Sequence, residues 1–129
     1  MIRGRPRRGP VALTDAPVVV SLTEFNARRF DDLPRMARDG LALSRAWWAM
    51  PGAISVTLYL DPCRRRGGSL SVWASEEDLR RFVALPRHVA IMRRYRDRVS
   101  VRAATWRTER FSAAAVWQER EARLAAGAR

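Results

Sequence analysis

Residues 53–74, AISVTLYLDPCRRRGGSLSVWA, decide the fold of this 129-residue chain. Apolar and polar residues alternate over Ala53 to Leu60 and again over Ser69 to Ala74, a pattern that predicts two β-strands. The stretch between them, Asp61 to Gly68, contains the proline, glycine and charged residues typical of a turn. A connection this short favours an antiparallel hairpin.

A strand and a helix are predicted before this hairpin. Pro17 to Phe25 is rich in β-branched residues and reads as a strand. Apolar residues then recur at helical spacing, which predicts one amphipathic helix from about Asp32 to Ala49.

A second helix and a fourth strand are predicted after the hairpin. Ser75 is followed three residues later by an acid, which is the pattern of a helix cap, and Pro86 is expected to kink the helix that follows. Val99 to Trp106 then predicts a strand, and Ser112 to Leu124 a terminal helix. The order β-α-β-β-α-β plus a helix is the split βαβ arrangement of an α+β, ferredoxin-like sandwich.

Composition limits the classes of function. The chain fits a single domain, predicted over residues 17–129, preceded by a disordered basic arm over residues 1–16. Its net charge is +12, but all 25 basic residues are arginine and they are scattered along the sequence. Dispersed, solvated charge is therefore expected, and a nucleic-acid partner is disfavoured. No stretch has the length of a membrane span, and a cytoplasmic protein is expected.

Cysteine and histidine are each present once, as Cys63 and His88. One cysteine cannot form an intrachain disulfide, and no His/Cys cluster with the spacing of a zinc site can be written. We therefore expect neither a metal nor another cofactor.

The alternation within the strands divides the sheet into two faces. If the most aliphatic stripes pack beneath the two helices, the opposite face carries large aromatics among small hydroxyl residues. Such a face is too aromatic to stay in water and too polar for a dry core, so something should cover it. Its proposed ligand-facing members are Phe25, Thr57, Tyr59, Ser71, Trp73 and Trp106.

Two covers are plausible for that face. A second copy could lay its own sheet across it and enclose a ligand cavity, or single-stranded RNA could stack its bases there. An RNA-recognition strand should continue with alternating aromatics after a basic residue and glycine, whereas Arg66 and Gly67 are followed by Gly68, Ser69 and Leu70. The homodimer is therefore favoured.

The stretch Gly68 to Arg94, GSLSVWASEEDLRRFVALPRHVAIMRR, resembles the dimeric α/β-barrel proteins that include the antibiotic-biosynthesis monooxygenases. The likeness lies in a strand ending in Trp, an acidic helix start and a small-residue-then-His step. It implies a dimeric α/β barrel and, in some members, oxygenation of aromatic polyketides without a cofactor. The heme-degrading branch uses a Trp and a His where this chain has Phe82 and Met92, so heme degradation is not carried over.

The sequence thus leads to two hypotheses. In the first, a homodimer binds a small aromatic or polyketide-like molecule and acts as a monooxygenase, with His88 as the base and Trp73 and Trp106 as walls. In the second, the same scaffold is a non-catalytic ligand-binding or interaction protein. His88 can equally be a structural histidine, and Tyr59, Ser71 and Thr57 can equally hydrogen-bond across an interface.

Overall fold

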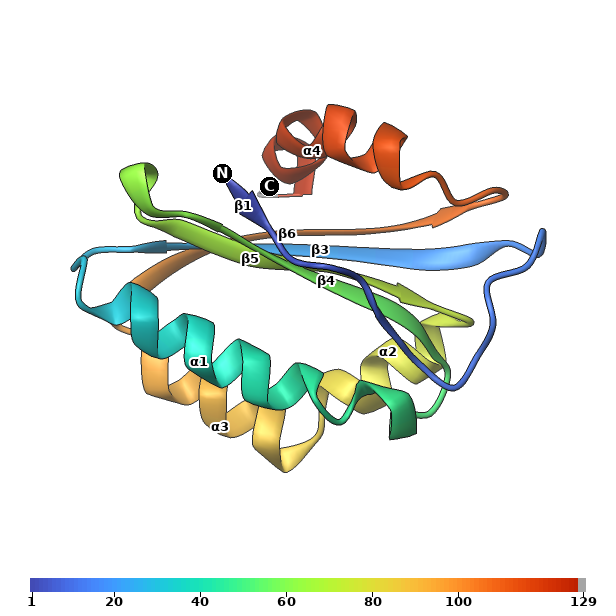
Figure 1. Cartoon of the computed structure of the whole chain (residues 1–129), viewed down its shortest axis with the longest axis horizontal. Coiled ribbons are helices and arrows are strands. Elements are labelled where there is room, and N and C mark those ends of the chain that lie inside the picture. The colour runs from blue at the N-terminus through green and yellow to red at the C-terminus, as the bar shows by residue number, and fades with distance from the viewer. Residues whose placement is uncertain (128–129) are drawn as a thin grey trace.

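The computed structural model describes residues 1–127 and has helices on both sides of one antiparallel sheet (Figure 1). The strands are β1 (Ile2–Arg3), β2 (Arg7–Arg8), β3 (Val18–Ala27), β4 (Ala53–Asp61), β5 (Arg66–Trp73) and β6 (Val99–Thr108). The helices are α1 (Asp32–Ser44), α2 (Glu76–Val83), α3 (Pro86–Tyr95) and α4 (Ala113–Gly127), with short 3-10 helices η1 (Trp47–Ala49) and η2 (Pro62–Arg64). Helices α1, α2 and α3 cover one face of the sheet, and α4 lies over the other.

The four long strands confirm the predicted α+β, ferredoxin-like topology. Their order across the sheet is β4-β5-β3-β6, so the first and third long strands lie in the middle. Strands β4 and β5 form the predicted antiparallel hairpin, in which Asp61 pairs with Arg66. The strands of the first βαβ half, β3 and β4, therefore alternate across the sheet with those of the second half, β5 and β6, as the split βαβ arrangement requires.

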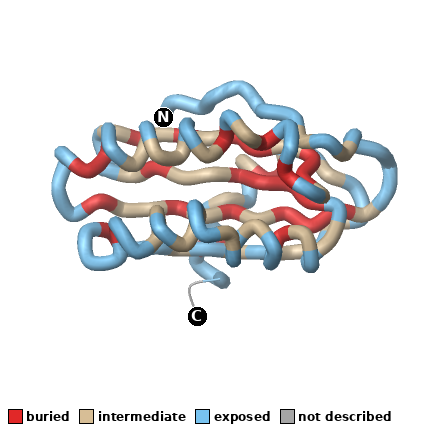
Figure 2. Tube along the Cα trace, turned by 90° about the horizontal axis from the view of Figure 1, so that it is seen from below, coloured by how far each residue is buried: buried red, intermediate tan, exposed pale blue. Residues whose placement is uncertain are grey.

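The N-terminal arm differs from the prediction of disorder. It lies along the outer edge of β4, where β1 places Ile2 opposite Leu60 and β2 places Arg8 opposite Ser55. Beyond β2, the Gly9 amide donates to the Ile54 carbonyl at 2.9 Å. An edge strand exposes unpaired backbone groups, and the arm pairs with them while its own residues stay exposed (Figure 2).

The first helix is shorter than predicted. It ends at Ser44 and is followed, after a turn, by η1, instead of continuing to Ala49. The break lets Trp47 enter the core, where it is buried and meets Trp73 and Phe82 edge-on with ring centroids 5.2 and 5.0 Å away. The burial of one large aromatic side chain here outweighs the continuation of the helix.

The second helix is divided in two at the predicted proline. Ser75 caps α2, since its hydroxyl oxygen accepts the Asp78 amide at 3.2 Å. Helix α2 ends at Val83, and Leu85 is extended (φ −61°, ψ 138°), as the residue before a proline prefers to be. Pro86 then begins α3, so the chain separates into two helices where a kink was expected.

The core beneath α1, α2 and α3 consists of two clusters. One is aromatic and surrounds Trp47 and Trp73; the other lies at the far end of the helices and contains Leu33, Tyr95 and Val99. Strand β4 contributes Val56 to the first cluster, as its alternation predicts.

The opposite core lies under α4 and corrects the predicted faces. The aliphatic stripes of β3 and β5 were expected beneath α1 to α3, but they pack against α4 instead. A bulge between Ala53 and Ser55 also turns Ile54 toward α4. The buried members of this cluster are Val18, Val20, Leu22, Ile54, Tyr59, Leu70, Val72, Val116 and Leu124. Because both faces are covered within one chain, alternation alone could not say which stripe faces which helices.

Candidate functional site

The helix-side face of the sheet carries two rows of small residues across its middle. In the first row, the pairing aligns Thr105 of β6 with Ser21 of β3 and Ser71 of β5. The next row aligns Ala103 with Thr23 and Ser69. We call the four hydroxyl residues Ser21, Thr23, Ser69 and Thr105 the hydroxyl floor.

The hydroxyls of the floor are free to bind something else. Ser21, Thr23 and Ser69 are half-buried and Thr105 is exposed. None of the four side chains makes a hydrogen bond to another residue of the described part of the chain. Because these residues are half-buried or exposed, their hydroxyls can donate to and accept from a ligand or water.

Ser71 is the exception in the first row. It is buried, its oxygen accepts the Trp73 indole N–H at 2.9 Å, and its own hydroxyl donates to the Ser21 carbonyl at 3.4 Å. Ser71 therefore serves to hold Trp73 in place and has no free hydrogen-bonding capacity comparable to that of the floor.

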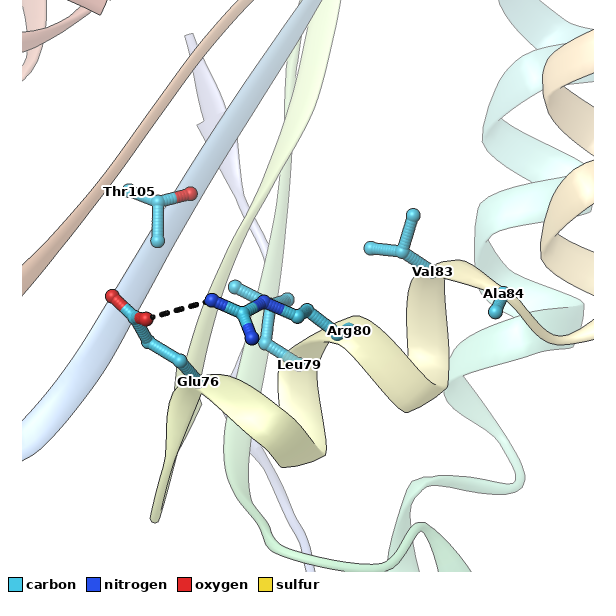
Figure 3. A pocket seen from close by; sticks show the side chains of 6 residues that line it. All are labelled: Glu76, Leu79, Arg80, Val83, Ala84 and Thr105. Carbon is cyan, nitrogen blue, oxygen red and sulfur yellow. Dashed lines mark hydrogen bonds and ion pairs between the residues drawn. The ribbon is translucent and has the colours of Figure 1, made fainter.

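A cleft of about 390 Å³ opens between β6 and α2 at one end of the floor (Figure 3). Thr105 faces it from the sheet, and the α2 side contributes the buried Leu79 and the exposed Val83. Glu76 and Arg80 form an ion pair at its rim, with 3.2 Å between Oε2 and Nη2. The cleft is thus apolar at its base, polar on the sheet side and charged at the entrance, a combination found in ligand sites.

The aromatic cluster lies on the same side of the sheet and shares Leu79 with the cleft. Trp73 is completely buried, and its ring packs against Trp47 and Phe82. A ring with no exposed surface cannot stack on a ligand without rearrangement, so Trp73 supports the wall rather than forming it.

His88 lies at the start of α3, beside the wall of the cleft. Its Nδ1 is 3.1 Å from the carbonyl oxygen of Val83, which lines the cleft, and its ring centroid is 4.7 Å from that of Phe82. A carbonyl oxygen can only accept, so Nδ1 carries the proton and the neutral ring leaves Nε2 as an acceptor. Burial lowers the pKa of His88 below its usual 6.5, against the opposing effect of the hydrogen bond to Val83. The ring is therefore neutral at pH 7 and has one free basic nitrogen.

The structure does not bring the sequence-predicted site residues together. Phe25, Ser71 and Trp73 lie on the helix side of the sheet, whereas Thr57, Tyr59 and Trp106 lie on the α4 side. The alternation within each strand predicted which face of the sheet each residue occupies, and that prediction is wrong for β3 and β5. Their roles in binding, and that of His88 in catalysis, stay predictions.

The α4 side holds a buried charge network that sequence reasoning missed. Glu24 lies in the middle of β3 with 3% of its surface exposed, and it accepts a hydrogen bond from the Tyr59 hydroxyl at 3.0 Å. Arg102 of β6 pairs with Glu24 and, at 2.7 Å, with Glu121 of α4. A single acid in an otherwise apolar strand was the available signal, because a buried carboxylate requires a partner.

The titration of this network follows its contacts. Burial, and then the charge and hydrogen bond of Glu24, raise the pKa of Tyr59. Hydrogen bonds to Glu121 and Glu24 raise the pKa of Arg102, and the bond from Arg102 lowers the pKa of Glu121. Tyr59 is therefore neutral at pH 7 and Arg102 and Glu121 are charged, so Arg102 acts as a fixed electrostatic connection between the sheet and α4.

Stacked arginines complete the contact between α4 and the sheet. The Arg123 guanidinium lies 4.5 Å from the Trp106 ring centroid, and that of Arg120 lies 5.2 Å from the Tyr59 ring centroid. Trp117 meets Tyr59 edge-on at 5.4 Å. Trp106 is therefore engaged by α4 and is not an open wall of a pocket.

Two kinds of feature are missing from residues 1–127. No three His, Cys, Asp or Glu side chains there lie close enough to hold a metal ion. Within the same residues, no helix is both long and apolar enough to cross a membrane.

Comparisons of sequence give no relatives. No protein-family model matches this chain. A search of curated proteins likewise finds no match.

Comparison of structure does find similar proteins. SnoaB, a cofactor-independent oxygenase from Streptomyces nogalater, aligns with a TM-score of 0.58 at 19% identity, over 76% of this chain and 98% of SnoaB. A protein from Deinococcus radiodurans, proposed to be an antibiotic biosynthesis monooxygenase, aligns at 0.61 and 12% identity, over 68% of this chain and 89% of that one.

A third match is longer than this chain. A proposed monooxygenase from Lactobacillus acidophilus aligns with a TM-score of 0.59 at 15% identity over 70% of this chain, which spans 44% of that protein's length. Identities this low establish the shared architecture and not the reaction. The chain has the fold of the antibiotic-biosynthesis-monooxygenase-like proteins.

Proposed function

We propose that this protein binds a planar aromatic molecule between the hydroxyl floor and α2, and oxygenates it without metal or flavin. The observation that carries the proposal is the floor itself, four hydroxyls on the helix side of the sheet without a partner among the described residues, of which Thr105 lines the open cleft. Apolar walls would take the rings of such a ligand, and the hydroxyls would take its phenolic or carbonyl oxygens. The similarity to SnoaB supports this choice of chemistry.

His88 supplies the base in this proposal. Its free Nε2 would remove a proton from a CH₂ group activated by neighbouring aromatic rings, leaving a carbanion that reacts with O₂. Overall, CH₂ and O₂ give C=O and H₂O: the carbon is oxidised by four electrons, and the oxygen molecule accepts them. The substrate is its own reductant, so no further cofactor is needed.

A non-catalytic binding protein is the second candidate, and one observation favours it. In the described part of the chain, no carboxylate hydrogen-bonds to His88, and its one recorded partner is the Val83 carbonyl at the end of α2. The ring could therefore serve to join α2 to α3, leaving a cleft that binds without reacting.

Thr23→Val tests the binding site. The substitution keeps the shape of the side chain and removes one floor hydroxyl, so we expect affinity for a hydroxylated polycyclic aromatic to fall about fivefold. Thr57→Val is the matched control, because Thr57 lies on strand β4 and faces α4, on the side of the sheet away from the floor. Titration calorimetry measures both. Equal effects of the two substitutions would place the ligand somewhere other than the floor.

His88→Ala tests catalysis. With a hydroxyanthrone as substrate, we expect oxygen uptake to fall on the order of 100-fold, and His88→Asn, which can still donate to the Val83 carbonyl, should not restore it. Because the neutral ring is the active form, the wild-type rate should decline as pH falls below 6.5 toward the lowered pKa of His88. Recovery of the rate in His88→Asn would assign the histidine a structural role. Ligand binding without any oxygen uptake by the wild type would favour the second candidate.

The homodimer expected from the sequence stays a prediction. The sequence pattern favoured it because one sheet face looked uncovered, but α4 covers that face and Tyr59 is buried within the single chain. A partner copy would therefore not pack directly on the sheet face that α4 covers.

A further inference from the structure

We propose that the protein also binds single-stranded nucleic acid, along the edge of the molecule formed by the N-terminal arm, α1 and η1. We call this surface the basic edge. Its members are Arg5, Arg7, Arg8, Arg35, Arg38, Arg45 and Trp48. The proposal concerns a surface separate from the cleft and does not depend on the chemistry proposed there.

The arm supplies the first arginines of the basic edge. Arg5, Arg7 and Arg8 are exposed, and none of them lies within 4.0 Å of a carboxylate in residues 1–127. Pairing fixes the backbone of β2, with Arg7 opposite Val56 and Arg8 opposite Ser55, so these two side chains leave the edge on opposite sides. Backbone pairing therefore holds the arm in place along β4, with its arginine side chains exposed.

Helix α1, which contacts β4, carries further arginines on the helix side of this edge. Arg35, Arg38 and Arg45 are exposed, and in the described residues they too have no ion-pair partner. Arg45 follows the last residue of α1 and precedes Trp48 by three positions. In Figure 1 the arm and α1 both lie on the viewer's side of the molecule, along the β4 edge.

Trp48 is the aromatic member of the basic edge. It is 73% exposed, more than any other large hydrophobic residue of the described chain. Its neighbour Trp47 is buried in the aromatic core, and hydrogen bonds from the Ala49 and Met50 amides close the η1 turn at 3.1 and 3.0 Å. The exposed Trp48 therefore belongs to a turn that the buried Trp47 holds in place, next to β2 of the arm.

Unpaired arginines beside one exposed ring fit single-stranded nucleic acid. Guanidinium groups bind phosphates, and an unstacked base gains by stacking on an indole, which every base can do. A membrane-binding surface would instead need several apolar side chains on one side of a helix. Arginines that are scattered along the sequence are therefore expected to bind one ligand together at this surface.

The test uses the full chain and a labelled oligothymidylate of about 12 nucleotides, with binding followed by fluorescence anisotropy. Changing Arg5, Arg7 and Arg8 to Gln together should weaken binding at least tenfold. It should also reduce the slope of log K against log salt by about 2, since each lost phosphate contact on a single strand contributes about 0.7. Trp48→Ala should weaken binding about five- to hundredfold and leave that slope unchanged.

The control removes the same number of charges elsewhere. Arg29, Arg64 and Arg81 are each ion-paired, to Asp31, Asp61 and Asp78. Their joint change to Gln should alter affinity less than threefold. A loss equal to that of the arm variant would mean that net charge alone drives binding and would overturn the proposal. So would an unchanged affinity in Trp48→Ala, or binding to phosphatidylserine vesicles with none to the oligonucleotide.

Discussion

Trp73→Ala is expected to lower the free energy of unfolding by about 3–5 kcal/mol, the range for removing a large buried aromatic side chain. Trp73 has no exposed surface and packs against Trp47 and Phe82 with ring centroids 5.2 Å away in both cases. Its loss would leave a cavity between three elements and would also free the Ser71 hydroxyl. Urea unfolding followed by far-UV circular dichroism measures the change without relying on tryptophan fluorescence.

Trp106→Ala is the matched control for this prediction. Trp106 is also on a long strand, but it is only partly buried and lies against the Arg123 guanidinium. Its removal should therefore cost clearly less than that of Trp73. Equal losses would mean that the aromatic cluster is not the main core of the helix side.

Arg102→Met is expected to destabilise the protein by about 3–5 kcal/mol, because it would leave a buried carboxylate without its positive partner. Glu24 is 3% exposed, and Arg102 connects it to Glu121 of α4. The arginine thus neutralises a charge in the sheet and fastens the terminal helix in one contact. Chemical denaturation at pH 7 gives the magnitude.

The double variant Glu24→Gln with Arg102→Met separates these two contributions. Removing both charges should recover much of the lost stability, because the uncompensated carboxylate is then gone. Arg80→Met, which breaks an exposed pair on α2, should change stability little. If the double variant were as unstable as Arg102→Met alone, the loss would come from detachment of α4 and not from the buried charge.

These two predictions concern opposite faces of the sheet, and the site depends on both. The aromatic cluster fixes the distance between the sheet and α2, which sets the width of the cleft. The network around Glu24 holds α4 against the other face and so keeps the central strands dry. The hydroxyl floor lies on strands β3, β5 and β6. Contacts on both faces hold these strands in place, so a rigid scaffold sets the positions of the floor side chains.

Much of this could be predicted from the residues. Alternation in 53–74 gave the β4–β5 hairpin, Ser75 and Pro86 marked where helices begin and divide, and the element order implied the ferredoxin-like sheet. Each of these features depends on neighbours in sequence, through backbone preferences and side-chain periodicity. His88 could be named as a candidate base because it is the one histidine of the chain, and its role stays a prediction.

The arrangement of the site was decided by the tertiary structure. The sequence placed Tyr59, Trp73 and Trp106 on one face, but the strand register puts Trp73 on the helix side and the other two on the α4 side. Alternation shows which residues share a face of one strand, and it does not show which helix will cover that face, because either apolar stripe can be buried. The path of the arm along β4 and the pairing of Glu24 with Arg102 join residues far apart in the chain, so only the folded molecule could bring them together.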